Sequence, residues 1–372
     1  MAVIGTYNLE KAQEQERDQD EDEDASPGPA QPQSRNGSLV LLRIDDTKID
    51  ILQNLSTPSA ILDVHFLPRH VPSGNFGTAN SNGSFSLYEL TGDEKQRPTT
   101  MVHIKTIQYF AENVLVTSFA WHPERFMVGM TGSDGRVCLG VIDGGGDEEG
   151  NVLPVGKHSV EAWTLAFSRD AESVLSGGDD SALRMMDLSE EQEQQDHEGS
   201  GRGRVHQKTA RYWPWMDTRI HGAGVTAILP LHRDNASSLI VTGSYDDRIR
   251  LLGVEPTGQR RVLADANLGG GVWRIKLLEQ RPRLPANHGV DKWRAEPPPT
   301  EVLLLVSCMH AGAKVVKMKK EGDVWAFEVL AKMEEHQSMN YGSDAQSFVN
   351  RQGKRTFLST SFYDRLLCLW RF

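Results

Sequence analysis

One short pattern recurs along this chain: a strand end made of small residues, a turn that contains aspartate, and a short strand of alternating apolar residues. The pattern is found at Ser176–Asp180, Gly243–Asp247 and Ser361–Asp364, and each copy leads into a predicted strand, at Ala182–Asp187, Arg248–Val254 and Leu366–Phe372. A chain that reuses one supersecondary unit folds as a solenoid or a propeller. The repeat therefore limits the possible folds more strongly than any other feature of the sequence.

Alignment on the turn extends the repeat to three more units. The six aligned turn positions are Asn82, Asp134, Asp180, Asp246, His310 and Asp364. Their spacing, 46 to 66 residues, exceeds the ~40–45 residues of a four-stranded blade of the WD-repeat pattern. The excess is predicted to lie in surface insertions at 189–206, which is rich in Glu, Gln, Gly and Ser, and at 279–300, which is rich in Pro, Arg and Asn.

Short apolar strands occupy corresponding places in the repeated units. They are predicted at Ala2–Leu9, Ser38–Ile44, Ala60–Phe66, Thr117–Trp121, Glu161–Phe167, Val225–Pro230, Gly271–Leu277 and Val324–Met333. Regular turn signals and the near absence of helical periodicity indicate an all-β fold. We therefore predict a single β-propeller of about seven blades over residues 1–372, with an acidic and Pro-rich disordered loop at 10–37 inside the first blade.

Composition excludes several classes of protein. The net charge is −11, and the chain has no basic stripe, so binding of nucleic acid through phosphates is not expected. The three cysteines are far apart and form no Cys-x-x-Cys pair, which is typical of a reducing compartment. No signal peptide and no apolar run of ~20 residues is present. We expect a cytoplasmic protein that does not contact membranes.

The aspartates of the turns have a structural interpretation. An Asp in a tight turn accepts hydrogen bonds from the backbone that follows it. In WD-repeat blades the Asp also belongs to a network with a His, a Ser or Thr, and a Trp, and His158, Ser176 and Asp180 match three of these members. Met186 stands at the Trp position, so the predicted network lacks its fourth member.

A set of motifs in a fixed order resembles one family more closely than WD-repeat proteins in general. The motifs are His158–Trp163, Ser176–Asp180, Thr242–Asp246, Gly269–Arg274, Ser307–His310, Tyr341–Asp344 and Thr360–Asp364, and the most specific are Gly-Gly-Val-Trp-Arg and Cys-Met-His. Over roughly residues 56–372 the chain resembles the WD-repeat diphthine methyl ester hydrolases (diphthine methyltransferases in older naming). The resemblance implies removal of a methyl ester from over-methylated diphthine on a histidine of elongation factor 2, with this factor and other diphthamide-pathway proteins as partners.

The chain departs from the family pattern in three places. The family has a strand pair before the Gly5-Thr6-Tyr7 motif, which supplies the outer strand of the last blade and the inner strand of the first. Here the chain starts at Met1, so we expect an incomplete first blade. Ala345 and Gln346 follow Tyr341–Asp344 where the family has an aromatic residue. Third strands carry no Trp at Gly140, Met186 and Leu252.

The sequence contains no common catalytic or cofactor motif that would identify a reaction. The sequence contains no Gly-x-Ser-x-Gly, no His-Glu-x-x-His and no P-loop, so neither a metal nor a cofactor is expected. His310 is the one aligned turn position without Asp or Asn, which suggests a general base that activates water, with Asp344 or Asp364 orienting it. Cys308 is the rival candidate as a covalent nucleophile, because regular alternation would place it on the same strand face.

Further residues are predicted to contact the substrate. Tyr245, Tyr363 or backbone N–H groups would stabilise an oxyanion. Trp273 is predicted to lie in the core, with contact to the substrate as the alternative. Arg274 would pair with a substrate carboxylate or with an Asp of the next blade. The candidate substrate-binding set is Tyr245, Asp246, Trp273, Arg274, Tyr363 and Asp180.

Two alternatives remain open from the sequence. His310 can be a turn residue with local hydrogen bonds only. The whole chain can be a non-catalytic WD-repeat scaffold that presents one protein to another, which is the usual role of propellers of this repeat type.

Overall fold

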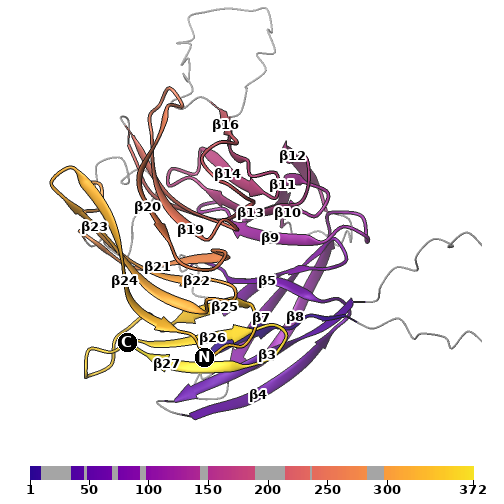
Figure 1. The fold of residues 1–372 in the computed structure, drawn as a ribbon. Helices are drawn as coiled ribbons and strands as arrows, with labels where there is room; N and C mark the ends of the chain where they lie inside the picture. The colour runs from indigo at the N-terminus through magenta and orange to yellow at the C-terminus, as the bar shows by residue number, and fades with distance from the viewer. Residues whose placement is uncertain are drawn as a thin grey trace, which may run out of the picture. The chain divides into compact units, whose positions relative to one another are not determined.

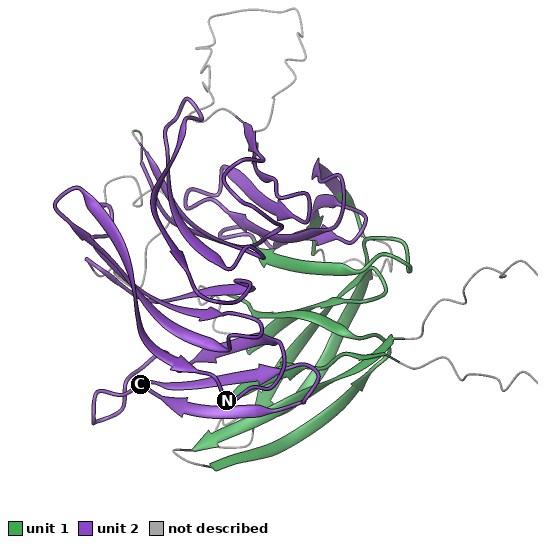
Figure 2. Ribbon diagram, in the orientation of Figure 1, with its two compact units in different colours: residues 1–121, 140–152 green, residues 122–139, 153–372 purple. Residues whose placement is uncertain are grey.

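The structure is all-β, as the sequence predicts. Figure 1 shows a computed structural model, which describes residues 1–9, 35–45, 48–68, 74–92, 98–142, 150–188, 214–234, 237–282 and 297–372. No helix occurs in these residues, and so none that could cross a membrane. The strands form seven sheets. The chain divides into two compact units, residues 1–121 with 140–152 and residues 122–139 with 153–372, shown in green and purple in Figure 2.

The two sheets that lie entirely in unit 1 differ in how many strands lie side by side. Their strands are β1 (Ala2–Gly5), β2 (Asn8–Leu9), β3 (Arg35–Asp45) and β4 (Lys48–Thr57), followed by β5 (Ile61–Phe66), β6 (Asn75–Asn80), β7 (Ser84–Gly92) and β8 (Pro98–Gln108). The second sheet has the order β5-β6-β7-β8. In the first sheet, β1 and β2 both pair with β3, and β4 also pairs with β3. Since a strand has two edges, β1 and β2 share one of them, and the first blade has fewer strand positions, as predicted.

The strands of the next sheet are divided between the units. They are β9 (Val116–Trp121), β10 (Met127–Gly132), β11 (Arg136–Val141) and β12 (Val152–Lys157).

Four sheets lie entirely in unit 2, and all are antiparallel with sequential strand order. The first two comprise β13 (Ala162–Phe167), β14 (Ser173–Gly178), β15 (Leu183–Asp187) and β16 (Trp215–Asp217), then β17 (Val225–Arg233), β18 (Ser238–Ser244), β19 (Arg248–Val254) and β20 (Arg260–Asn267). The last two comprise β21 (Arg274–Arg281), β22 (Glu301–Ser307), β23 (Ala313–Glu321) and β24 (Val324–Met333), then β25 (Asn340–Ala345), β26 (Thr356–Ser361) and β27 (Leu367–Arg371). Each hairpin joins neighbouring strands, so every turn of the repeat connects the second and third strand of one sheet.

Some predicted boundaries differ from the structure. Strand β3 begins at Arg35, so the predicted loop at 10–37 ends earlier, and its residues 10–34 lie outside the described residues. Strand β21 runs to Arg281 because Gln280 and Arg281 still pair with Val302 and Glu301. The predicted insertion at 279–300 therefore starts later, and most of it, like all of 189–206, lies outside the described part of the chain.

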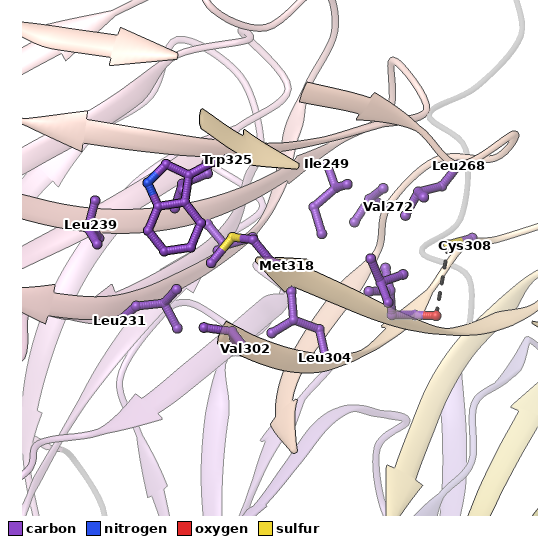
Figure 3. Close-up of a cluster of buried hydrophobic side chains, with 14 residues drawn as sticks. Leu231, Leu239, Ile249, Leu268, Val272, Val302, Leu304, Cys308, Met318 and Trp325 are labelled. Atoms are coloured by element: carbon purple, nitrogen blue, oxygen red, sulfur yellow. Dashed lines mark hydrogen bonds between the residues drawn. The ribbon is translucent and has the colours of Figure 1, made fainter. Parts of the chain in front are cut away.

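The apolar core of unit 2 fills the space between neighbouring sheets. Figure 3 shows one cluster, in which Leu231 and Leu239 of one sheet lie near Val302, Leu304 and Met318 of the next. Val302, Leu304 and Val306 alternate along β22 and are fully buried, as expected for a strand with one face in a core. Burial of side chains of this size is worth about 1.5–3 kcal/mol each. This packing holds the turns of adjacent sheets at fixed positions.

The three cysteines are free and buried, each in a different sheet. Cys138 lies in β11, Cys308 directly follows β22, and Cys368 lies in β27. Burial raises the pKa of the Cys138 thiol to about 11. These thiols are therefore protonated and shielded from reagents in the folded chain.

The small residues that end each second strand are required by close packing. A Cβ added at Gly243 would lie 2.2 Å from Cγ1 and 2.7 Å from Cβ of Val272. Gly177, at the same place in its hairpin, approaches Val225 in the same way, with Cβ distances of 2.6–2.7 Å. Bulkier residues at these places would push the first strand of the next sheet away.

We predict that Gly243→Ala lowers the free energy of unfolding by about 2 kcal/mol, because the methyl group overpacks the contact with Val272. Gly222→Ala is the matched control, since its added methyl would meet only Asp246, at 3.5–3.6 Å, and should change the free energy by less than about 0.5 kcal/mol. Urea unfolding of the two variants measures both values. Equal effects would show that the short contact at Gly243 has no energetic cost.

Candidate functional site

The predicted network of His158 is present and joins the loop between β12 and β13 to the turn between β14 and β15. His158 Nδ1 lies 2.8 Å from Asp180 Oδ1, and its Nε2 lies 2.8 Å from Ser176 Oγ. Met186, at the usual Trp position, offers its sulfur 4.0 Å from Ser176 Oγ. Burial lowers the pKa of His158, so the imidazole is neutral. Burial works against the Asp180 carboxylate, but the Ser159 N–H and His158 hydrogen bonds outweigh it and lower its pKa.

The next and the last sheets of unit 2 contain shorter versions of this network. His221 Nε2 lies 2.9 Å from Thr242 Oγ1, and Asp246 forms a 2.8 Å ion pair with Arg250. In the last sheet, His336 Nε2 lies 2.9 Å from Ser359 Oγ. The backbone N–H of Gly222 donates to Asp246 at 2.8 Å. This geometry gives Asp180 and Asp246 a role in holding the fold.

His310 occupies the place in its hairpin that aspartate occupies in the others. Ser307 and Ala313 are the last paired residues of β22 and β23, and His310 is the middle one of the five residues between them. Asp180 and Asp246 are central in the same way between the last pairs of their hairpins. The strand register therefore confirms the alignment that singles out His310.

The conformation of the His310 turn is nevertheless different. In the other two hairpins the residue after the central Asp, Ser181 or Asp247, has a positive φ. Here the positive φ angles are those of Met309, at 42°, and Gly312, at 72°. The predicted regular alternation of Cys308 and His310 therefore fails: Cys308 is fully buried, whereas His310 is exposed.

The hydrogen-bond network of the other three sheets that lie entirely in unit 2 is missing behind His310. Leu268 and Val306 stand where the first sheet of unit 2 has His158 and Ser176, and both are buried apolar residues. Lys314 pairs with Val306 in the ladder, and its ammonium group donates to the backbone carbonyl of Leu268. Among the described residues, no hydrogen bond to the His310 side chain is recorded. The imidazole is therefore not needed to hold this turn.

The prediction that Cys308 is a nucleophile is wrong for this fold. Its side chain belongs to the core cluster of Figure 3 and is completely buried. Burial raises the pKa of the thiol to about 12, and the thiol donates weakly to the Val306 carbonyl at 3.8 Å. A buried, protonated thiol cannot attack an external ester.

The structure does not bring His310 together with either predicted orienting carboxylate. Asp344 is exposed on β25 and forms an ion pair with Lys276. Asp364 accepts hydrogen bonds from Gln337 N at 2.9 Å and Ser338 Oγ at 2.6 Å, which join its turn to the loop between β24 and β25. Hydrogen bonds from Ser338 and Ser361 lower the pKa of Asp364 to about 2.

A cluster of aromatic rings lies beside the His310 turn. Trp163, Tyr245 and Trp273 are in mutual contact, with ring centroids 5.6, 6.0 and 6.4 Å apart, and Tyr341 contacts Trp273 at 4.9 Å. All four side chains are only half-buried, so the prediction that Trp273 lies in the core is wrong. We refer to these four residues as the aromatic cluster.

The cluster and the His310 turn meet at Gly271. A Cβ built on Gly271 would lie 2.5 Å from the sulfur of Met309 and 3.4 Å from Cδ1 of Tyr245. Met309 directly precedes His310, so the turn and the Tyr245 ring flank the same glycine. The absence of a side chain at Gly271 is what allows this close approach.

Two members of the cluster were missed by sequence reasoning. Trp163 and Tyr341 are the extra residues of β-bulges at the start of β13 and β25. A bulge redirects a side chain out of the regular alternation. Trp273 has the equivalent place, immediately before β21, and donates its backbone N–H to Ser307 at 2.8 Å. The sequence does contain a signal for these positions, because an aromatic residue recurs at the start of the first strand of several sheets.

The remaining candidates lie at or near the cluster. The guanidinium of Arg274 lies 5.0 Å from the Trp273 ring centroid and donates to the Trp273 carbonyl at 3.2 Å. Burial, and to a smaller extent neighbouring Tyr341 and Asp179, raises the pKa of Tyr245, so its hydroxyl keeps its proton and can donate. Tyr363 is 73% exposed and stacks edge-on against Phe362 at 5.0 Å. In the part of the chain that the structure describes, no group of three or more His, Cys, Asp or Glu side chains could hold a metal ion.

The sheets and their hairpins define a WD-repeat β-propeller, and solved structures agree. The structure is similar to a chain in the mitotic checkpoint complex, with a TM-score of 0.55 and 15% identity, over 91% of this chain and 84% of that one. It is also similar to Sqt1 from Chaetomium thermophilum, with a TM-score of 0.55 and 13% identity over 89% and 75% of the two chains. No family model matches the sequence.

Curated proteins similar to this chain share one name. The chain is 28% identical over 340 residues to the diphthine methyltransferase of Schizosaccharomyces pombe, covering 90% of this chain and 86% of the relative. It is 26% identical over 419 residues to that of Saccharomyces cerevisiae, covering 99% and 92%. The human protein of this name is 28% identical over 78% of this chain and 57% of its own length. The predicted resemblance is confirmed: this chain is similar to proteins named diphthine methyltransferase.

Proposed function

We propose that this protein hydrolyses the methyl ester of methylated diphthine on elongation factor 2 in the cytoplasm and releases the carboxylate for amidation. One support is the similarity to proteins named diphthine methyltransferase. A second support is the exposed imidazole of His310, at a turn that the fold does not need this side chain to hold. That imidazole lies next to half-buried aromatic side chains that can bind a substrate group. The single observation that carries the proposal is the replacement of the structural network by Leu268, Val306 and His310 in one of the four sheets that lie entirely in unit 2.

In this proposal His310 acts as the general base. One ring nitrogen of the neutral imidazole accepts a proton from water as the water oxygen attacks the ester carbonyl. The tetrahedral intermediate carries its negative charge on the former carbonyl oxygen. The imidazolium then gives the proton to the departing methoxide, so that methanol and a carboxylic acid are formed. The acid loses its remaining proton to solvent and becomes the carboxylate. No covalent intermediate on the protein is required, which agrees with the burial of Cys308.

The Tyr245 hydroxyl is the candidate donor to the oxyanion. It stays protonated at neutral pH, because burial raises its pKa. Its ring flanks Gly271 together with Met309, the residue before His310. Donors aimed at the developing charge typically supply 10²–10³-fold in rate, about 3–4 kcal/mol. Tyr363 is more exposed and is the second candidate for this role.

The test is methanol release by the purified full-length protein from elongation factor 2 that carries methylated diphthine. We expect one methanol per modified site and a loss of 14 Da from the factor, and we expect the Cys308→Ala variant to retain this activity. Binding of the factor without methanol release would instead support the scaffold alternative. That alternative draws on a propeller neighbour: Sqt1 has been crystallised bound to the N-terminus of ribosomal protein L10.

A further inference from the structure

The aromatic cluster presents ring surface in several directions. Trp163 and Tyr245 are nearly perpendicular, at 89°, and Trp273 is inclined to them by 60° and 39°. These three rings come from three successive sheets of unit 2, and Tyr341 comes from the fourth, so the sheet packing fixes the rings relative to one another. Half-buried Trp and Tyr side chains in this arrangement offer π faces to a ligand from solvent.

Carboxylates accompany the rings. The indole N–H of Trp163 donates to Asp179 Oδ1 at 3.4 Å. A Cβ built on Gly224 would lie 2.7 Å from Asp179 Oδ1 and 2.9 Å from Cδ2 of Tyr245, so the carboxylate and the ring border the same glycine. The backbone carbonyl of Glu161 accepts from Asp179 N at 2.8 Å, and the negative charges of both residues contribute to raising the pKa of Tyr245.

The side chain of Arg274 is a cation that already contacts the aromatic cluster. The Arg274 guanidinium lies 5.0 Å from the Trp273 ring centroid, within the range of a cation–π contact. Arg274 covers one face of one ring, whereas Asp179 lies next to Trp163 and Tyr245. Two acids and one guanidinium leave the surroundings of Trp163 and Tyr245 favourable to a further positive charge.

We propose that the aromatic cluster binds an ammonium nitrogen that carries methyl groups. Such a cation cannot donate the hydrogen bonds that Asp179 would accept from lysine, and its methyl groups spread the charge over an apolar surface. It is therefore bound by aromatic faces, assisted by nearby negative charge at a distance. An ordinary lysine would keep its water shell more strongly and gain less from the rings.

This inference rests on the proposed function for its biological ligand, because diphthine contains a trimethylated ammonium group close to its carboxyl group. The cluster would hold that group while the ester reaches His310, whose turn meets the cluster at Gly271. The binding chemistry itself can be measured without any hydrolysis.

The experiment uses choline and its uncharged isostere, 3,3-dimethyl-1-butanol, with the full-length protein. The indole N–H signals of the tryptophans are followed by NMR during titration with each compound. We expect saturable shifts of the Trp163 and Trp273 signals with choline, and at least about tenfold weaker binding of the isostere. Equal binding of the two compounds, or no binding of choline, would overturn the inference.

Three variants separate the cluster from general surface binding. Asp179→Asn removes an exposed charge without disturbing the core and should weaken choline binding about threefold or more. Trp163→Leu should weaken it about tenfold. Phe348→Leu, which removes a ring that is 63% exposed and outside the cluster, should leave it unchanged. If choline binds as expected but no methanol is released from the modified factor, the proposed hydrolysis fails and this inference stands.

Discussion

His310→Ala is expected to lower kcat/KM for methyl ester hydrolysis by at least about 100-fold, the usual contribution of a general base. The free energy of unfolding should change by less than about 0.5 kcal/mol, because the side chain is exposed and the hydrogen-bond network seen in the other blades is absent behind it. Methanol release and urea unfolding of the same preparation provide the two measurements.

His310→Asp is the informative control for this position. It restores the residue type found at the centre of the hairpins that contain Asp180 and Asp246. If His310 were only a turn residue, this variant should fold and hydrolyse the ester normally. We expect it to fold and to be as inactive as the alanine variant. Added imidazole should restore part of the rate of His310→Ala but not of His310→Asp. Full activity in folded His310→Ala would eliminate the general-base role.

His158→Ala is expected to lower the free energy of unfolding by about 3 kcal/mol, the largest effect we predict for stability. The imidazole is fully buried and makes two hydrogen bonds of 2.8 Å, to Asp180 and Ser176. Its removal leaves a partly buried carboxylate and a buried hydroxyl without these partners, and it leaves a cavity behind them. Chemical unfolding followed by tryptophan fluorescence measures the loss.

His221→Ala provides the matched comparison in the neighbouring sheet. His221 is also buried, but only its Nε2 has a partner, Thr242, at 2.9 Å, and its Nδ1 is buried without a hydrogen bond. Removing an unpaired polar atom offsets part of the cost, so we expect a loss of about 1–2 kcal/mol. An equal or larger loss for His221→Ala would show that the network of His158 contributes no more than simple burial.

Most of the fold was predictable because the repeat combines several independent local signals. Small residues, an Asp turn and alternating apolar residues have to coincide for one hairpin, and they do so around Asp180 and Asp246. The ends of strands were less predictable where a strand continues into a polar stretch of sequence. Gln280 and Arg281 read as part of an insertion, but their backbone pairing with β22 is independent of side-chain type.

The candidate site was predictable only in part. The position of His310 follows from counting residues between paired strands, which a repeat alignment reproduces. The different exposure of Cys308 and His310 does not follow from regular alternation, because Met309 between them has a positive φ, which methionine rarely adopts. The aromatic cluster joins Trp163 to Tyr245 and Tyr341 through bulges and sheet packing, and these rings are separated by about 80 to 180 positions in the sequence.

The three buried thiols can serve as natural probes of local unfolding. Cys138, Cys308 and Cys368 belong to three different sheets, and each is shielded in the folded state. A thiol reagent can therefore label each one only when its own blade separates transiently from its neighbours. Mass spectrometry of the labelled peptides would time these events separately, without any introduced probe. The rate at Cys308 would measure how often the blade that carries His310 loosens as a unit.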